Sequence, residues 1–283
     1  MPLTPEHKRI LGTYYKVSDS AYRNWGPDPE RLGIFAIHLG FFPKDQPDID
    51  NRKAVRLMTE KVIEATDIHP GQRILDAGCG VGSISFPICS RFPEVQVFPI
   101  NVVEQQLRTA HSHQTEVGAQ NLHLSLQDYQ KTGFLDNTFD RIIFCESLAH
   151  AQDKRELLQE VYRTCKVGGR IIIADVFSYT TDFTEEEKEY FTNFQDGMGV
   201  PSIALYSQLL DWLQEIGFGN IQPNNLTENM LPSAVFASEH AALRIKQERD
   251  APSSVTLGRL AIIGIEKLMS HHKAGYYLVT AQK

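Results

Sequence analysis

The sequence carries its clearest chemical signal in a glycine-rich run that follows an apolar stretch, Ile74 to Gly82. The acid Asp76 precedes Gly78 by two residues, and glycine recurs at every second position through Gly80 and Gly82. Glycines at such a turn let the backbone bend sharply and approach a ligand with no Cβ in the way. The spacing is G-x-G-x-G, which differs from the G-x-G-x-x-G pattern of dinucleotide binders. The sequence therefore predicts a nucleotide-binding loop of the Rossmann-like kind.

Polar side chains that could contact a ligand end each expected strand of this region. They are Asp76, Asn101, Asp128, Glu146 and Asp175. In a parallel sheet, ligands bind beyond the carboxyl ends of the strands. These polar residues at one edge of one sheet therefore predict a binding site rather than a scatter of surface positions.

The elements that must position these residues alternate along the chain from Gln72 onward. We expect strands at 73–76, 95–101, 122–126, 141–145 and 170–175, helices at 104–117 and 154–165, and a final strand at 276–281. The run 170–175 is continuously apolar, as in strands that are buried on both faces. Strands that alternate with helices indicate an α/β fold with a Rossmann-like, doubly wound, mostly parallel sheet.

The same pattern divides the chain into four segments. Residues 1–65 read as helical and are expected to form a lid, because the apolar residues at 34–42 must pack on the core or on a ligand. Residues 66–180 form the nucleotide-binding core, 181–270 a helical cap and acceptor region with late core elements, and 271–283 the last strand. In the cap we expect helices at 183–197, 206–216 and 234–268, the first with a capping box of Thr184 and Glu187 and the last interrupted at Pro252.

Two prolines are expected to disturb regular structure. Pro87 lies in the first helix after the glycine loop, where it should kink that helix. Pro99 lies near the end of the strand 95–101, where its missing N–H removes a hydrogen bond from the sheet.

Composition excludes several classes of protein. The chain of 283 residues has a formal net charge of −7, which argues against nucleic-acid binding. Its four cysteines show no CxxC pair and no zinc spacing, so we expect no metal site and buried thiols in a reducing, cytoplasmic compartment. The first residues do not read as a signal peptide, and no apolar stretch approaches the roughly 20 residues that span a bilayer.

The motifs together resemble class I S-adenosylmethionine (SAM) methyltransferases. An acid two residues before closely spaced glycines is typical of that class, as in Asp76 to Gly82. Within the class, the chain resembles the group of tocopherol and sterol C-methyltransferases, prenyl diphosphate C-methyltransferases and the rebeccamycin sugar O-methyltransferase. The matching residues are Tyr14, Trp25-Gly26, His38 to Phe42, Asn101 with Gln106, Glu146 to His150, Ile173 to Val176, and Ala274 to Tyr276.

This resemblance implies a seven-stranded sheet and a site for SAM, with S-adenosylhomocysteine (SAH) as product. Backbone groups of Gly78, Cys79 and Gly80 would contact the amino-acid tail of SAM, and Asp76 would orient its amino group or the loop itself. Asn101, with Gln106, would hold the ribose hydroxyls, a role that an acid fills in most of the class. Asp128 would accept from the adenine amine with Tyr129 packed nearby. Tyr14 and Tyr22 would lie over the cofactor when the N-terminal segment closes.

The expected catalytic groups are Glu146, His150 and Asp175. Glu146 would hold the SAM amino group or steer the acceptor. His150 is either a general base, since an imidazole pKa of roughly 6.5 suits proton removal near neutrality, or a structural loop histidine. Asp175 would orient that base or bind acceptor hydroxyls. Ala149 stands where the rebeccamycin enzyme has the first of two histidines, so a two-histidine base is absent.

The predicted function is SN2 transfer of a methyl group to oxygen, carbon or nitrogen of a small natural product. The acceptor is expected to be amphipathic or apolar, and assembly into a homo-oligomer is compatible with the sequence. The alternative is a SAM-binding cyclase, or an isoprenoid C-methyltransferase that also triggers cyclisation.

Overall fold

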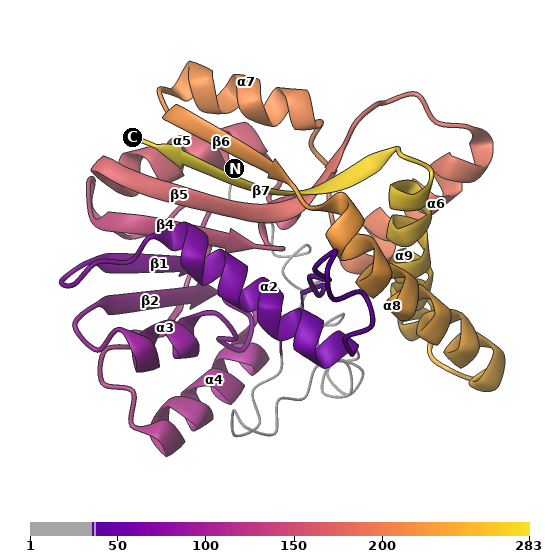
Figure 1. The fold of residues 1–283 in the computed structure, drawn as a ribbon, viewed down its shortest axis with the longest axis horizontal. Helices are drawn as coiled ribbons and strands as arrows, with labels where there is room; N and C mark the ends of the chain where they lie inside the picture. Colours follow the sequence, from indigo (N-terminus) through magenta and orange to yellow (C-terminus); the bar gives the residue numbers. More distant parts are fainter. Residues whose placement is uncertain (1–35, 37) are drawn as a thin grey trace.

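A computed structural model describes residue 36 and residues 38–283, and every structural statement below concerns these residues. Seven strands form one sheet in the order β3-β2-β1-β4-β5-β7-β6, in which β7 runs antiparallel to both its neighbours (Figure 1). The strands are β1 Arg73–Ala77, β2 Gln96–Asn101, β3 Ser125–Leu126, β4 Phe139–Cys145, β5 Cys165–Ser178, β6 Gly219–Asn225 and β7 Ala274–Gln282. The predicted α/β class and the mostly parallel, seven-stranded sheet are confirmed.

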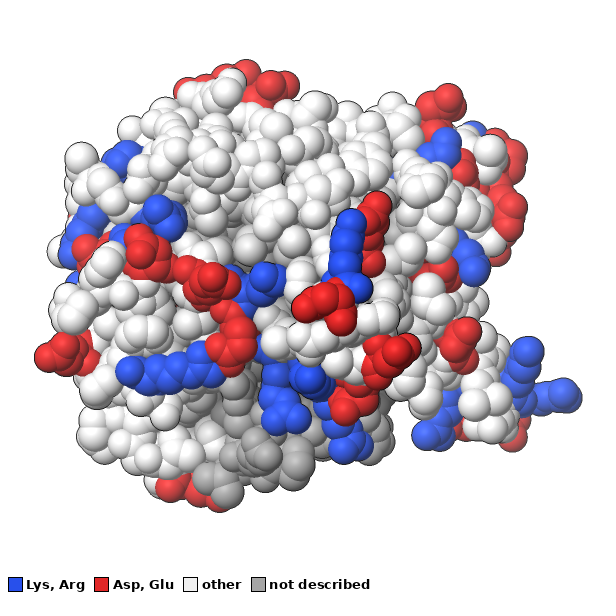
Figure 2. All heavy atoms as spheres, in the orientation of Figure 1, with Lys and Arg blue, Asp and Glu red and all other residues white. Residues whose placement is uncertain are grey.

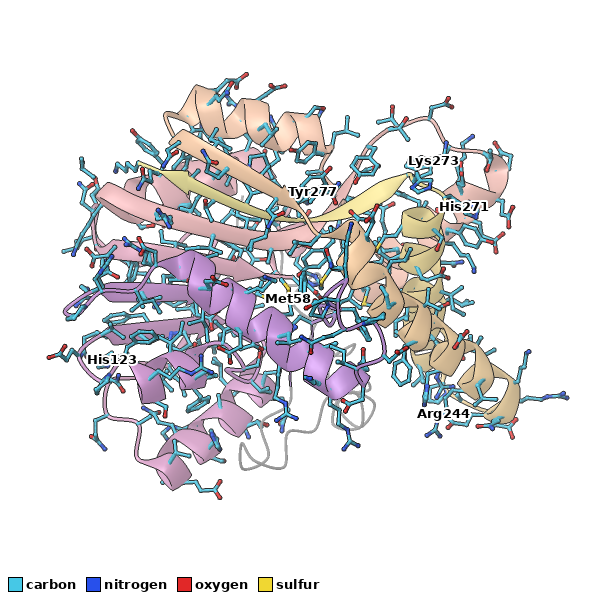
Figure 3. All side chains as sticks on the ribbon, viewed as in Figure 1. Met58, His123, Arg244, His271, Lys273 and Tyr277 are labelled. Carbon is cyan, nitrogen blue, oxygen red and sulfur yellow. The ribbon has the colours of Figure 1, made fainter. Side chains whose placement is uncertain are left out.

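Helices cover both faces of the sheet and gather beyond one of its ends. They are α2 Asn51–Thr66, α3 Ser85–Arg91, α4 Glu104–Val117, the short 3₁₀ helix η2 Leu148–His150, α5 Lys154–Thr164, α6 Glu185–Met198, α7 Tyr206–Ile216, α8 Thr227–Gln247 and α9 Ser253–Ser270. One apolar cluster packs α2 on one face, with the buried Met58 directed at the sheet (Figure 3). A second packs α5 and α7 on the other face. The sheet is therefore doubly wound, as its sequence pattern indicates.

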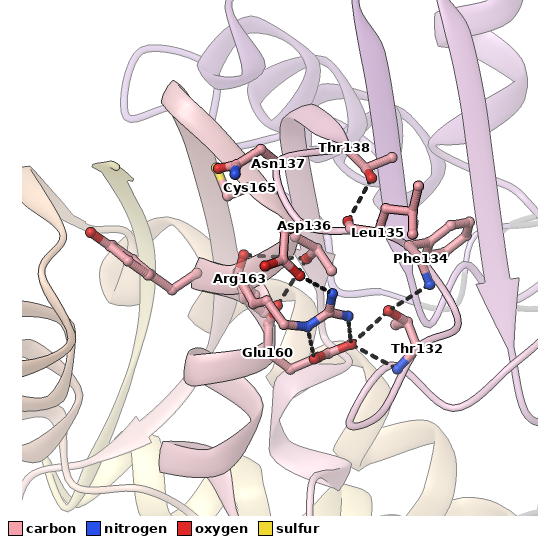
Figure 4. Close-up of polar contacts among 12 residues, drawn as sticks. Thr132, Phe134, Leu135, Asp136, Asn137, Thr138, Glu160, Arg163 and Cys165 are labelled. Atoms are coloured by element: carbon pink, nitrogen blue, oxygen red, sulfur yellow. Dashed lines mark hydrogen bonds and ion pairs between the residues drawn. The ribbon is translucent and has the colours of Figure 1, made fainter.

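The connection into β4 is fixed to α5 by a compact polar network (Figure 4). The Glu160 carboxylate accepts from the Thr132 backbone N–H at 2.8 Å and from the Arg163 guanidinium. Arg163 also reaches Asp136 at 2.6 Å. Because this network orders the chain just before β4, it contributes to the position of the residues that follow that strand.

Pro99 shortens the pairing of β2 with its neighbour. The Val97 backbone bonds with the segment around Leu122, and the Asn101 carbonyl accepts from Gln127, so alternate residues of β2 face that side. Pro99 faces it too and has no N–H to donate. The expected strand 122–126 is accordingly reduced to an isolated bridge at Leu122 and the two residues of β3.

Pro87 is the third residue of α3, which begins at Ser85. The Phe86 and Ile88 N–H groups donate to the Gly82 and Ile84 carbonyls, whereas Pro87 between them has no N–H to donate. Pro87 thus interrupts the series of helical hydrogen bonds at the start of α3, and the expected kink stays a prediction.

One strand begins earlier than the sequence predicts, and another was not expected. The helix α5 ends at Thr164, and β5 begins at Cys165 rather than at residue 170, so that it includes Gly168 and Gly169. The strand β6 was not expected, because its sequence is polar and six of its seven residues are exposed at the edge of the sheet.

The cap consists of α6, α8 and α9. Helices α6 and α9 touch through glycines, since a Cβ on Gly197 would lie 2.3 Å from the Leu257 carbonyl oxygen and one on Gly264 would lie 2.4 Å from that of Tyr190. The predicted capping box of Thr184 and Glu187 is present. Glu187 also contacts His271 at 3.4 Å and Lys273 at 3.3 Å, which joins α6 to the start of β7 (Figure 3).

The N-terminal segment differs in part from the expectation of a helical lid. The predicted helix at the end of this segment is present as α2, but residues 38–50 are irregular. We call residues His38 to Phe42 the strap. Residues 1–35 and 37 lie outside the described part of the chain, so the lid stays a prediction.

Candidate functional site

The glycine loop follows β1 and is built by backbone conformations that only glycine adopts readily. Gly78, Gly80 and Gly82 have φ values of 81°, 57° and 91°. A Cβ on Gly78 would lie 2.6 Å from the Ser147 Cβ. The Gly78 and Cys79 N–H groups both donate to the Ile100 carbonyl, at 2.9 and 3.1 Å. These two N–H groups therefore hold the loop against β2, so the expected contact of a ligand with them would require their release.

Asp76 is bound to the loop's own framework. Its carboxylate accepts a hydrogen bond from the Ser85 hydroxyl, at 2.5 Å, and is 2% exposed. Burial raises its pKa to about 6, against the smaller lowering effect of Ser85. Of the two expected roles, the structure favours orientation of the loop, because this bond fixes the first residue of α3.

Asn101 ends β2 and has both sides of its amide engaged. Its Nδ2 donates to the Gly80 carbonyl at 3.3 Å and to Gln106 Oε1 at 2.8 Å, while Oδ1 accepts from the backbone N–H groups of Val102 and Val103. Gln106 lies on the first turn of α4 and is 7% exposed. Asn101 therefore joins the glycine loop to α4 and fixes the position of the Gln106 amide.

Asp128 and Tyr129 follow β3 and are both buried. Asp128 Oδ1 accepts from the Gln130 backbone N–H at 3.0 Å. The Tyr129 hydroxyl donates to the Ser147 carbonyl at 2.6 Å, and its ring packs on Phe144. The structure thus places Tyr129 in the core and bonds it to the segment after β4.

Glu146 directly follows β4 in a strained conformation. Its φ of 51° is rare for a residue with a side chain, and such strain is concentrated at functional sites. The Leu39 N–H of the strap donates to its Oε1 at 2.9 Å. The pKa of this carboxyl group is raised to about 8, mainly because burial removes it from water; the Leu39 N–H and the Tyr276 hydroxyl lower the pKa, and the nearby Asp175 raises it. The side chain keeps partial exposure.

Asp175 lies inside β5 and holds the turn that carries His150. Its carboxylate accepts from the Ala149 N–H at 3.1 Å and from the Val176 N–H at 2.8 Å. Burial raises its pKa to about 6. Asp175 therefore orients His150 through the backbone of η2, and this partly exposed residue ends that turn.

Several positioning residues escaped the sequence analysis. The Ser147 hydroxyl donates to the Ala77 carbonyl at 2.6 Å, Gln130 Oε1 accepts from the Gln152 N–H at 2.7 Å, and the buried Lys154 donates to the Ala151 carbonyl at 3.0 Å and to Ser202. Ser147 and Lys154 had a weak sequence signal, since each lies within four residues of a residue singled out for chemistry.

The strap closes one side of this site. The Gly40 N–H donates to Ser233 of α8 at 2.8 Å, and the Phe42 N–H donates to the Asn229 carbonyl at 2.9 Å. A Cβ on Gly40 would lie 2.7 Å from the Ala54 Cβ of α2. The strap thereby links α2, the cap and Glu146. Tyr14 and Tyr22 precede it and lie outside the described residues.

The site is acidic while the surface is mixed in charge. Asp76 and Glu146 lie at the carboxyl ends of β1 and β4. Asp175 lies inside β5 at the same level, one residue after Ala174, which pairs with Cys145 at the end of β4. The face in Figure 2 carries acidic and basic side chains next to one another, with no continuous basic area among its described residues. No group of residues suited to hold a metal ion and no helix suited to cross a membrane occurs in the described part of the chain.

Comparison with known proteins matches residues 68–218 to the family described as a methyltransferase domain. The 24-methylenesterol C-methyltransferase 3 of Arabidopsis thaliana is 27% identical over 77% of this chain, which spans 59% of that enzyme's length. The O-methyltransferase resE of Aspergillus sclerotiorum is 26% identical over 87% of this chain and 89% of its own. Among solved structures, the 4+2 cyclase SpnF superposes with a TM-score of 0.80 and 24% identity, covering 100% of this chain and 98% of the cyclase, which shows a shared fold.

Proposed function

This chain belongs to the methyltransferase-domain family and is a SAM-dependent methyltransferase that acts on small molecules, and we propose that its acceptor is an apolar or amphipathic natural product. We further propose that SAM binds between the glycine loop and the carboxyl groups of Asp76, Glu146 and Asp175. When bound, SAM supplies a methyl group that is activated by a positively charged sulfonium.

The observation that carries this placement is the acidic edge itself. Two carboxyl groups lie at the ends of β1 and β4 and a third lies beside them within β5, and burial raises the pKa of each. A cation in this position stabilises the ionised carboxylates and lowers their pKa again. Because SAM carries both a sulfonium and an ammonium group, the edge fits it better than it fits an anionic nucleotide.

The adjacent side chains supply the remaining contacts in this proposal. Gln106, fixed by Asn101, faces the ribose hydroxyls, and Asp128 accepts from the adenine amine. Support comes from their positions, because both lie buried at the carboxyl edge of the sheet on the side of β2 and β3. Glu146 holds the ammonium group of the cofactor's tail.

His150 is proposed as the base that accepts a proton from a hydroxyl or amino acceptor. His150 is partly exposed as a residue while its Nδ1 is buried, and its backbone is held by the turn that Asp175 fixes. Alignment in a dry site contributes most of the rate of such a displacement, and proton removal adds to it. A carbon acceptor with a π bond would instead need an apolar pocket, stabilisation of the cation that forms when its π electrons attack the methyl group, and a base that removes a proton from that cation.

The apolar character of the acceptor is supported by the cluster around the site. Ala149 and Tyr276 pack in one cluster with Phe194 of α6, with Val200 and with Met230 of α8. Apolar side chains of the cap and Ala149 of the turn that carries His150 thus belong to the same apolar cluster. This wall suits a carbon skeleton with few charges.

A labelled product and SAH distinguish methyl transfer from cyclisation, because only methyl transfer forms both of them. The protein is incubated with SAM that carries a labelled methyl group and with a metabolite extract. We expect label in an organic-soluble product together with an equal amount of SAH. A cyclised product without label or SAH would replace this function by the alternative cyclase, and an unlabelled, unchanged extract containing known acceptors of O- and C-methyltransferases would contradict it.

A further inference from the structure

The Tyr276 hydroxyl is a buried polar group whose role the fold does not explain. Tyr276 lies in β7 and is 0% exposed. Within the described part of the chain, its hydroxyl makes no hydrogen bond of good geometry, although it lies close enough to the Glu146 carboxyl group to lower the pKa of that group. A buried polar group without a partner costs stability, and each one in a native protein calls for a reason.

The backbone around Tyr276 prevents the ring from moving to a better position. The Tyr276 N–H donates to the Thr227 hydroxyl at 3.0 Å, and its carbonyl accepts from the Leu226 N–H at 2.9 Å. The preceding Gly275 allows this approach, because a Cβ there would overlap the Tyr179 hydroxyl. The hydroxyl is therefore held in its place.

That place is beside Glu146. Burial raises the pKa of the Tyr276 phenol well above its usual value, and Glu146 is the largest of the charged influences on it. Cys145 of β4 and Asp175 of β5 follow, and Asp76 of β1 is near enough to Cys145 to raise the pKa of that thiol. The Leu39 N–H of the strap donates to the Glu146 carboxyl group. His150 of η2 follows Glu146 by four residues in the sequence.

We propose that Tyr276 is a positioning residue for Glu146, whose hydroxyl donates a hydrogen bond to the Glu146 carboxylate when a cationic ligand group holds that carboxylate ionised. The phenol O–H rotates freely, so only a proton must turn toward the charge. This inference rests on the proposed function, in which Glu146 faces the ammonium group of SAM. The hydrogen bond from Tyr276 thereby lowers the pKa of Glu146, so that a larger fraction of Glu146 is ionised at neutral pH.

The test measures SAH affinity by calorimetry against pH. SAH keeps the ammonium group but lacks the sulfonium, so it reports on Glu146. Wild-type affinity should rise with pH as Glu146 ionises around its pKa of about 8. In Tyr276→Phe the donor is lost, so the pKa of Glu146 rises and the midpoint of this increase moves to higher pH. Each unit of displacement weakens binding at neutral pH by about tenfold, and the two curves meet above the midpoint.

The thermal midpoint separates this role from a structural one. Since Tyr276→Phe removes a buried hydroxyl that makes no hydrogen bond of good geometry in the ligand-free protein, we expect its Tm to equal or exceed that of the wild type. Tyr277→Phe is the matched control, because the Tyr277 hydroxyl points away from this site and is bonded to Asn225 at 3.1 Å and Tyr179 at 3.2 Å. That control should lose stability and keep the pH midpoint for SAH. Glu146→Gln should flatten the pH dependence.

Three results would decide against the proposal. They are a Tyr276→Phe curve that coincides with the wild type, a loss of affinity that is the same at every pH, and a lower Tm with an unchanged midpoint. If the phenylalanine variant does not fold, Tyr276→Met removes the same donor and should show the same displacement. A wild-type protein that binds neither SAM nor SAH at any pH would instead overturn the proposed function.

Discussion

At the scale of single residues, the site is organised by side chains that hold other groups in place. Asn101 and Asp175 both had expected roles toward ligands, and the structure shows each one engaged with the backbone. Asn101 uses its two N–H bonds on Gly80 and Gln106, and Asp175 fixes the turn before His150 through Ala149. The groups that remain for contact with a ligand are therefore those that Asn101 and Asp175 hold in place, which are the Gln106 amide and the His150 imidazole.

The first prediction concerns Asn101→Asp. Most of the wider class has an acid at this position, which by itself suggests tolerance. Here, a carboxylate would face the Gly80 carbonyl and Gln106 Oε1, both of which now accept from Nδ2. We expect Asn101→Asp to weaken SAH binding at least as much as Asn101→Ala, each by about 1–3 kcal/mol, measured by calorimetry.

Asn121→Asp is its control, because the Asn121 Nδ2 also donates to backbone carbonyls, those of Cys89, Phe92 and Val95, but away from the site. The control should lower Tm and leave SAH affinity of the folded protein unchanged. Wild-type affinity in Asn101→Asp would show that Asn101 does not act as a donor in the complex.

The second prediction is that the ligand-free protein loses stability as pH rises toward the pKa of Glu146. The folded pKa of about 8 lies above the ordinary value of 4.5, so the folded state binds more protons between these two values. Stability is then greatest at the acid end of this window and falls as pH rises through it. Tm measured across the window should fall less in Glu146→Gln, whereas the exposed Glu94→Gln should follow the wild type. An unchanged slope in Glu146→Gln would exclude Glu146 as the source.

At the scale of elements, the strap is the piece that joins the cap to the sheet. It reaches Glu146 through Leu39, α8 through Gly40 and Ser233, and α2 through the close contact with Ala54. Its buried His38 also bonds to Thr59 at 3.1 Å. A shift of the strap therefore changes the surroundings of Glu146 and the position of α8 together.

The third prediction uses Gly40→Ala. The added Cβ would lie 2.7 Å from the Ala54 Cβ and 2.9 Å from the Val55 nitrogen, so the strap must move. We expect SAH affinity to fall by about tenfold, which corresponds to the loss of roughly one hydrogen bond to a charged group. Gly219→Ala is the control, because a Cβ there meets nothing within 4 Å. Equal affinity in both variants would remove the strap from the binding site.

At the scale of the whole molecule, the sequence predicted the elements in which chemically distinctive residues accompany a regular pattern of apolar residues. The glycine loop, the strand that ends at Glu146, the apolar strand around Ile172 and the capping box at Thr184 could all be predicted, because local patterns determine them. The edge strand β6 could not, since a polar edge strand has no burial pattern. Contacts such as those of Ser147 with Ala77 and Leu39 with Glu146 join residues far apart in sequence, which no local pattern reveals.

The fourth prediction is that residues 1–45 act as a lid on the cofactor. The segment is too short for a core of its own, and the described strap at its end already lies against Glu146. A protein that lacks residues 1–42 should keep the circular dichroism signal of the sheet and lose most of its SAH affinity and activity. Proteolysis within the segment should slow when SAH is added. Cleavage that is indifferent to SAH, or full activity after truncation, would contradict the lid.

The most direct test of the central claim, that SAM binds at the glycine loop, is calorimetric titration of SAH into two matched variants. Gly80→Val and Gly118→Val impose a branched side chain at similar positive φ values, 57° and 67°, but only Gly80 belongs to the loop, and a Cβ on Gly118 meets nothing within 4 Å. With both variants folded, as judged by circular dichroism, we predict that Gly118→Val binds SAH like the wild type and that Gly80→Val does not bind it detectably. Equal SAH affinity in the two variants would contradict the account.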